Sequence, residues 1–183
     1  MSSEIMQLIQ EQELQSVDED VFSDKQGTQY LSFVVSEEEF SVNILKVQEI
    51  RAWEIPTFLP NSPAFILGVL NLRGTIVPVM DLRIRFGFRL FNYDPTTVVI
   101  ILKNTKDGKE SLMGCVVDAV SDVFNVDESK IKDAPDYFSS VDNRFIGGIM
   151  TVDKQPVTLL NLVNLLDLDL IEHQFAGRKV VNG

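Results

Sequence analysis

The segment FILGVLNLRGTIVPVMDL, residues 65–82, recurs in outline 80 positions later as FIGGIMTVDKQPVTLLNL, residues 145–162. In the first copy two apolar runs flank Arg73-Gly74, a pair that predicts a tight hairpin turn because glycine readily adopts positive φ. Asp81 in the first copy and Asn161 in the second are N-cap residue types that precede a further apolar stretch. Each copy is therefore predicted to be a β-hairpin followed by a short helix.

The similarity between the two halves extends upstream of these hairpins. An offset of 73 places Val42 on Cys115, Val47 on Val120 and Glu49 on Asp122. The two offsets differ by seven, the excess length of the connection 124–144 over the connection 51–64. This agreement indicates an internal repeat rather than a chance match.

The repeat divides the chain into two similar modules, predicted at residues 26–92 and 93–167. A tail of residues 1–25 precedes them and a second tail, residues 168–183, follows. Modules of this size with many short strands are typical of small, strongly twisted barrels. We therefore predict an all-β fold of two tandem five-stranded β-barrel subdomains with short helices. The barrels should pack together through runs without polar alternation, such as Val98 to Leu102.

Composition limits the partners that this chain can have. It has 183 residues, of which 45% are hydrophobic, with 16 Lys+Arg against 27 Asp+Glu and a net charge of −11. Such a charge disfavours nucleic acid and anionic lipid, so a protein surface is the expected partner. No apolar run approaches the roughly 20 residues needed to cross a bilayer. We expect an unexported, cytoplasmic protein that does not insert into a membrane.

The residue inventory also argues against catalysis. Cys115 is the only cysteine and His173 the only histidine, which leaves too few residues for most catalytic triads or zinc sites. Cys115 lies in an apolar run and is expected to be a buried core residue. The stretch Gly68 to Gly74 lacks a phosphate-loop pattern, and the carboxylates lack a metal-loop spacing. The sequence predicts no catalytic residues, no metal and no cofactor.

Arg73 allows two interpretations, either a solvated hairpin residue or a partner for a carboxylate. Glu49 is the natural carboxylate within the same module. The second copy has Asp153 and Asp122 at the matching positions, so no such pair can form there. This difference predicts a specific interaction surface on the first module.

The N-terminal segment also allows two interpretations. Ile5, Leu8 and Ile9 form a weak helical stripe, and an acidic stretch follows before Gly27. The segment could be a dispensable solubilising tail or a docking helix, and the sequence leaves both open.

Three motifs carry a more specific signal: NILKVQEIR at 43–51, GVLNLRG at 68–74 and IVPVMDLR at 76–83. They resemble the signatures of the CheW family of bacterial chemotaxis coupling proteins. The resemblance runs from about residue 26 to residue 167. It implies two SH3-like barrels without enzymatic activity. It also implies a scaffold that couples methyl-accepting chemotaxis receptors to the histidine kinase CheA, in arrays at the membrane.

The resemblance implies contacts for each partner. The receptor's helical tip would lie in an apolar groove between the barrels, with exposed Ile and Val side chains, and with Glu49 and Arg73 as a supporting polar pair. The kinase, through its CheW-like regulatory domain, would contact the end of the first barrel. The implied receptor-binding residues are Leu31, Ile44, Val47, Gly68, Gly74, Thr97, Val98 and Val99. A possible second kinase contact, which closes arrays into rings, matches Lys132, Asp136 and Tyr137. The alternative function, from another class, is a small-ligand-binding double β-barrel.

Overall fold

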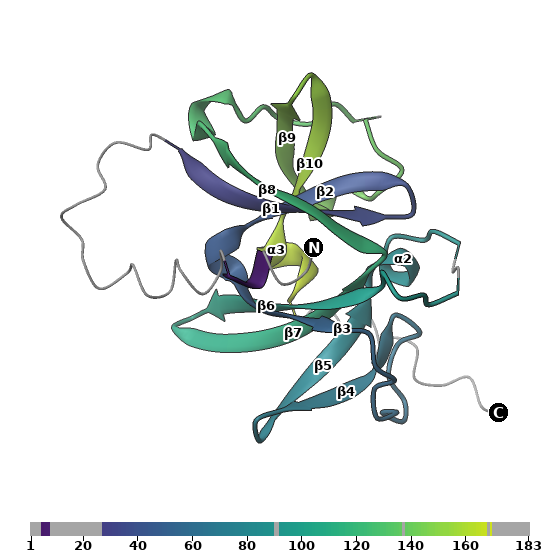
Figure 1. The fold of residues 1–183 in the computed structure, drawn as a ribbon. Helices are drawn as coiled ribbons and strands as arrows, with labels where there is room; N and C mark the ends of the chain where they lie inside the picture. Colours follow the sequence, from purple (N-terminus) through teal and green to yellow (C-terminus); the bar gives the residue numbers. More distant parts are fainter. Residues whose placement is uncertain (1–4, 8–26, 90–91, 137, 168, 170–183) are drawn as a thin grey trace.

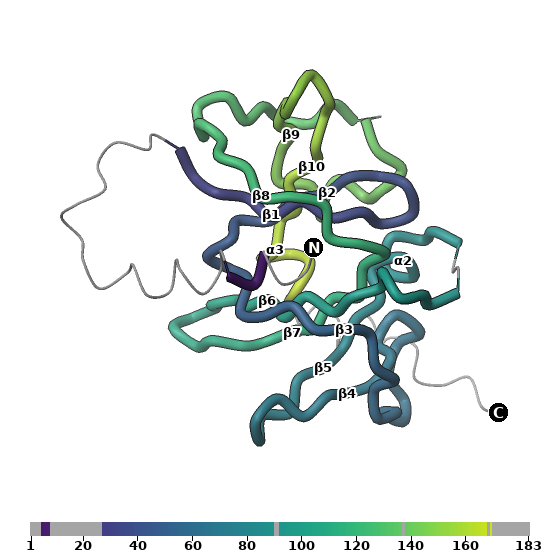
Figure 2. The backbone as a smooth tube through the Cα atoms, in the orientation of Figure 1, coloured from purple at the N-terminus to yellow at the C-terminus, as the bar shows by residue number. Residues whose placement is uncertain are grey.

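The protein is described by a computed structural model that covers residues 5–7, 27–89, 92–136, 138–167 and 169. Two five-stranded sheets make up most of it, and they lie one above the other in Figure 1. The all-β prediction with two five-stranded units and short helices is confirmed. The chain crosses from the first sheet to the second once and returns once, and Figure 2 shows this course of the backbone.

Each half of the chain has five strands followed by a short helix, and the two halves differ in where their 3-10 turns lie. The first half contains β1 (Thr28–Val35), β2 (Glu38–Asn43), the 3-10 turn η1 (Ile44–Lys46), β3 (Val47–Ala52), β4 (Ile66–Leu72), β5 (Thr75–Asp81) and α2 (Leu82–Arg85). The second half contains β6 (Val98–Lys106), β7 (Lys109–Val117), β8 (Ala119–Val126), η2 (Glu128–Lys130), η3 (Asn143–Phe145), β9 (Ile146–Val152), β10 (Gln155–Leu160) and α3 (Leu162–Leu165).

The repeat extends to individual hydrogen bonds. The backbone N–H of Asp81 donates to the Phe65 carbonyl at 2.8 Å, and the N–H of Asn161 donates to the Phe145 carbonyl at 2.8 Å. Both donors also cap the helix that follows, as the sequence predicts: the Asp81 side chain accepts from the N–H of Arg83, and the Asn161 side chain from that of Asn164. Each half is thus the same supersecondary unit.

The β4–β5 hairpin forms as predicted. Its turn residues Arg73 and Gly74 have φ values of 48° and 88°, and the Asn71 side chain accepts from the N–H of Gly74 at 2.7 Å. Two successive positive φ angles give the turn the twist that the paired strands require. Asp153 and Lys154 repeat this geometry in the second half, with φ values of 47° and 65°.

The sheets do not follow the predicted division at residue 92. One, here called sheet A, has the order β8-β1-β2-β10-β9, and the other, sheet B, has the order β3-β6-β7-β5-β4. Each sheet combines the opening hairpin of one half with the last three strands of the other half. Residues 26–92 and 93–167 are therefore repeats in the sequence but not separate barrels, which corrects the predicted subdomain boundaries.

Short connections explain this exchange of hairpins. The chain leaves β2 for β3 through η1, and leaves β7 for β8 through Asp118. Neither connection is long enough to fold β3 back beside β1, or β8 back beside β6. β3 instead pairs with β6, and β8 pairs with β1.

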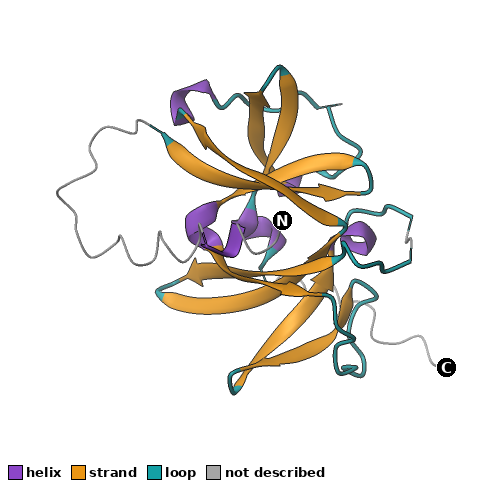
Figure 3. Cartoon of the chain, in the orientation of Figure 1, coloured by secondary structure: helices purple, strands orange, loops and turns teal. Residues whose placement is uncertain are grey.

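Strand β6 shows how the two sheets share their cores. Ile100 and Leu102 face the large core between the sheets, whereas Val99 and Ile101 belong to a separate cluster inside sheet B. A third cluster, around Tyr30, lies inside sheet A. Because β6 is buried on both faces, it lacks polar alternation. Ile100 and Leu102 join the two sheets as predicted, whereas Val99 and Ile101 pack inside sheet B. The short helical segments η1 and α3 lie between the sheets (Figure 3), and Ile44 and Leu165 are part of the core there.

Each sheet curls so far that a residue following one of its edge strands pairs with the other edge strand. In sheet B, Thr57 and Val69 exchange backbone hydrogen bonds of 2.9 and 2.8 Å. In sheet A, Lys132 and Ile149 do the same at 3.0 and 2.7 Å. These bridges close each sheet around its own core and give it the character of a small barrel.

A glycine beside each bridge permits this close approach. A Cβ on Gly68 would lie 2.1 Å from the Thr57 carbonyl oxygen, and one on Gly148 would lie 3.0 Å from the Lys132 carbonyl oxygen. Both glycines also have φ near 150° (148° and 157°), a region that side-chain-bearing residues rarely adopt. The structure thus assigns Gly68 a role in closing the barrel.

Candidate partner-binding surfaces

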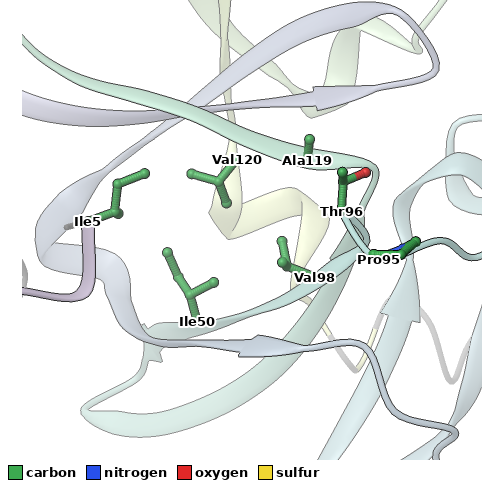
Figure 4. A pocket seen from close by; sticks show the side chains of 7 residues that line it. All are labelled: Ile5, Ile50, Pro95, Thr96, Val98, Ala119 and Val120. Carbon is green, nitrogen blue, oxygen red and sulfur yellow. The ribbon is translucent and has the colours of Figure 1, made fainter. Parts of the chain in front are cut away.

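An apolar cavity of about 390 Å³ lies between the two sheets. We call it the inter-sheet groove, and its lining side chains are drawn in Figure 4: Ile5, Ile50, Pro95, Thr96, Val98, Ala119 and Val120. The strands β3 and β6 supply its floor from sheet B, and β8 supplies its roof from sheet A. Thr96 provides the one polar side chain among the described residues that line it. Such a surface is suited to apolar side chains rather than to a charged ligand.

The eight residues implied as receptor contacts do not form one exposed surface. Leu31, Ile44 and Val47 are 0%, 4% and 3% exposed and belong to the core between the sheets. Val99 is 0% exposed and lies inside sheet B. The expectation of exposed Ile and Val side chains at these positions is wrong, because the packing of two sheets buries both faces of their shared strands.

The remaining four positions differ in accessibility. Thr97 is 2% exposed, and its side chain accepts from the N–H of Asp94 at 3.0 Å. Gly68 is buried beside the Thr57 bridge, whereas Gly74 is exposed at the hairpin tip. Val98 is half-buried and lines the inter-sheet groove. Val98 and Gly74 are thus the two implied contacts that a partner can reach directly.

The pair predicted between Arg73 and Glu49 forms. The Arg73 Nη2 atom lies 2.9 Å from Glu49 Oε2. The Arg73 side chain is 78% exposed, whereas that of Glu49 is 14% exposed and also lies 3.9 Å from Arg51 Nε. The contact joins the β4–β5 turn to β3, across the side where sheet B curls closed. An exposed arginine held in this way presents a fixed cation to a partner.

We expect this ion pair to contribute little to folding. Arg73→Ala should lower the free energy of unfolding by about 0–1 kcal/mol, because solvent screens an exposed pair. A double-mutant cycle with Glu49→Ala, followed by denaturant midpoints and by the receptor-dependent kinase activity that the resemblance implies, measures both effects. The effects on activity should be non-additive. Additive losses of activity would show that the two side chains act independently.

A second ionic cluster is buried beneath the helix α2. Arg83 donates from Nη2 and Nε to the two carboxylate oxygens of Asp81, at 2.8 and 3.1 Å, and both side chains are 0% exposed. The Tyr93 hydroxyl donates to Asp81 at 3.1 Å, and its ring packs under the guanidinium and stacks on Trp53. Burial, and then the charge of Asp81, raise the pKa of Tyr93 to about 12.

The same arginine connects the two sheets. Its Nη1 donates to Asp118 at 3.0 Å, at the point where the chain passes from β7 to β8. Asp118 in turn accepts from the N–H of Ser36 and donates its own N–H to the Val34 carbonyl, both in the β1–β2 hairpin of sheet A. Burial alone would lower the pKa of Arg83, but Asp81 and then Asp118 outweigh it and raise that pKa. The cluster fixes the mutual position of the sheets that form the groove.

The residues implied as a second kinase contact lie at the edge of sheet A. Lys132 forms the bridge to Ile149 and is exposed. Asp136 is also exposed and accepts from the Asn143 side chain at 3.2 Å. Tyr137 lies outside the described residues. Lys132 and Asp136 are therefore accessible to a partner.

Sequence reasoning missed a group of large apolar side chains that are exposed in sheet B. Ile55 is 86% exposed and Phe58 is 74% exposed, both in the connection from β3 to β4. Leu45, Leu59 and Ile76 are exposed as well. Exposed apolar residues concentrated on one connection are typical of protein contacts. The sequence feature that could have indicated this surface is the set of three prolines in that connection, Pro56, Pro60 and Pro63, since they predict an irregular projecting loop.

The one cysteine of the chain is a buried core residue. Cys115 is 1% exposed, and burial raises the pKa of its thiol to about 12, as expected for a core residue. No group of three or more His, Cys, Asp or Glu side chains in this part of the chain could hold a metal ion. No helix in this part of the chain is long and apolar enough to span a membrane. His173 lies outside the described residues.

Comparison with known proteins agrees with this architecture. Residues 29–169 match the model of the CheW-like domain. The chain is 38% identical over 140 residues to the chemotaxis protein CheW of Klebsiella aerogenes, covering 76% of this chain and 82% of that protein. It is 32% identical over 140 residues to the chemotaxis protein CheW of Bacillus subtilis, covering 76% and 85%.

A solved structure is also similar. The scaffolding protein TtCheW from Thermoanaerobacter tengcongensis superposes with a TM-score of 0.70 at 30% sequence identity, covering 79% of this chain and 91% of that one. The family match covers most of the chain, the two relatives match in sequence, and the solved structure matches in sequence and in fold. This chain therefore belongs to the CheW family of chemotaxis scaffold proteins.

Proposed function

We propose that this protein couples methyl-accepting chemotaxis receptors to the histidine kinase CheA in the cytoplasm, without catalysing a reaction itself. The observation that carries the proposal is the Arg73–Glu49 contact of 2.9 Å at an exposed corner of sheet B. The equivalent corner of the other repeat has two acidic residues instead. An exposed polar contact that is expected to add little to stability, and that one of two repeats has while the other lacks it, supports a binding role for this corner.

The receptor contact proposed here is narrower than the resemblance implies. A receptor helix would place apolar side chains in the inter-sheet groove, against Ile50, Val98 and Val120. Leu31, Ile44, Val47 and Val99 would act beneath this surface by fixing the strands that carry it. Such helix-in-groove binding takes its affinity from apolar anchors at helical spacing.

The kinase contact is proposed for the end of sheet B. Ile55 and Phe58 offer apolar area there that the fold leaves uncovered. A like barrel from the regulatory domain of CheA could cover this area end to end. The exposed Lys132 and Asp136 on sheet A are proposed as the second contact, which would close receptor arrays into rings.

The alternative of a small-ligand-binding barrel finds less support. The inter-sheet groove is large enough for a small apolar molecule. Among its described lining residues, however, Thr96 is the one polar side chain, so nothing there would fix the orientation of a specific ligand.

Val98→Glu tests the receptor contact. A carboxylate in the groove must lose its hydration without gaining a partner when a helix binds, so affinity for a receptor cytoplasmic fragment should fall by at least about tenfold. Isothermal titration with the folded variant measures this. Thr105→Glu is the matched control, since it adds the same charge at an exposed position of the same strand. Equal affinities for the two variants would refute the groove as the receptor site.

A further inference from the structure

The inter-sheet groove already has an occupant from the same chain. Residues 5–7 form a helical turn at its open side, and the Ile5 side chain points into it toward Val120 and Ile50 in Figure 4. Ile5 is 9% exposed and is part of the core cluster between the sheets. Met6 packs against the same cluster, whereas Gln7 is exposed.

The chemistry of this contact is that of an amphipathic helix in a groove. The sequence has apolar residues at Ile5, Leu8 and Ile9, the i, i+3, i+4 spacing by which such helices bind. A partner helix with this spacing would need the same side of β3 and the same face of β8. The N-terminal residues and a partner helix therefore cannot occupy the groove together.

The contact is suited to exchange. Ile5 and Met6 meet the sheets by apolar packing, which is non-directional and grows with the area buried. One buried side chain gains roughly what it costs to order the few residues that present it. A partner helix with a longer apolar face can therefore displace the segment. While the segment occupies the groove the partner cannot bind, so the partner's apparent affinity is its intrinsic affinity multiplied by the fraction of molecules whose groove is free.

We propose that residues 5–6 are an intramolecular competitor for the inter-sheet groove, and that a receptor helix binds there by displacing them. The inference deepens the proposed function and rests on it for the identity of the competing helix. The occupancy of the groove by the N-terminal segment can be measured without any receptor. The sequence leaves a solubilising tail and a docking helix open for residues 1–25, and all of that tail except residues 5–7 lies outside the described residues.

A thiol placed in the groove reports its coverage. Val120→Cys supplies the reporter, and native Cys115 is 1% exposed with a pKa raised to about 12 by burial, so it reacts slowly. Ile5→Glu should raise the maleimide labelling rate of the reporter by about threefold or more, because a charged side chain leaves the groove. Gln7→Glu is the matched control, since it adds the same charge two residues away at an exposed position. Equal labelling rates in the two backgrounds would overturn the proposal.

The same substitutions, without the reporter, are then titrated with a receptor cytoplasmic fragment. Ile5→Glu should lower the apparent dissociation constant by a factor similar to its effect on labelling, while Gln7→Glu leaves it unchanged. If labelling rises but affinity does not, the competition is refuted although the segment does cover the groove. If no variant binds the fragment, the proposed receptor function fails, and the labelling result still decides whether residues 5–6 cover the groove.

Discussion

Arg83→Ala is expected to destabilise the protein by about 3–5 kcal/mol, the cost typical of removing one partner from a buried ion pair. The substitution would leave the carboxylate of Asp81, which is 0% exposed, without the guanidinium that it accepts two hydrogen bonds from. It would also release Asp118, the residue that connects β7 to the β1–β2 hairpin. The sheets would lose both a charge pair and the contact that positions them.

Urea denaturation of the folded variant measures this loss. Arg144→Ala is the matched control, because Arg144 also pairs with an aspartate, Asp142, at 3.3 Å, but both side chains are about half exposed (46% and 56%). That substitution should cost about 0–1 kcal/mol. If the two arginine variants unfold at similar urea concentrations, the buried cluster does not have the role assigned to it.

Gly68→Ala is expected to lower the free energy of unfolding by about 3 kcal/mol or more. The new Cβ would lie 2.1 Å from the carbonyl oxygen of Thr57 and 2.7 Å from its carbonyl carbon, and both are backbone atoms. Relief of this clash requires the Thr57–Val69 bridge to open, and with it the closure of sheet B. Loss of the proposed receptor binding in such a variant would follow from the loss of this closure.

Two other glycines make this expectation specific. Gly74 has a positive φ of 88° but nothing within 4 Å of its Cβ position, so Gly74→Ala should cost only about 1 kcal/mol, from backbone strain. Gly148→Ala should fall between them, because its nearest contact, at 2.7 Å, is a methyl group of Ile131 that can move. Denaturant midpoints measure these losses of stability, which should be largest for Gly68→Ala, intermediate for Gly148→Ala and smallest for Gly74→Ala if the clash at the bridge is their cause. If Gly68→Ala destabilises the protein no more than Gly74→Ala does, the clash with the Thr57–Val69 bridge is excluded as the cause.

Local features of the fold were predictable because nearby residues decide them. The Arg73-Gly74 pair determines the hairpin between β4 and β5, and Asp81 determines where α2 begins, through its bond from the N–H of Arg83. The repeat was recognisable because both halves keep this order of turn, strand and cap. The Glu49–Arg73 contact was predictable as well, since both residues lie on one module and their counterparts in the other module are both acidic.

Which residues lie on the candidate binding surfaces could not be predicted, because this depends on which strands far apart in the sequence pair with each other. The two opening hairpins have similar apolar patterns, so the sequence does not show that each pairs with strands of the opposite half. That pairing decides that Val47 and Val99 are buried while Val98 lines the groove.

The amino-acid sequence by itself determined the repeat, the turns, the helix caps and the family. Tertiary structure alone decided the exchange of hairpins, the burial of the implied receptor contacts and the place of Ile5 between the sheets. The physical reason is the range of the interactions. Turns and caps depend on residues two or three positions apart, whereas Arg83 and Ser36 meet Asp118 across 35 and 82 positions. Which distant partners meet depends on connection lengths and on the packing of both sheets together.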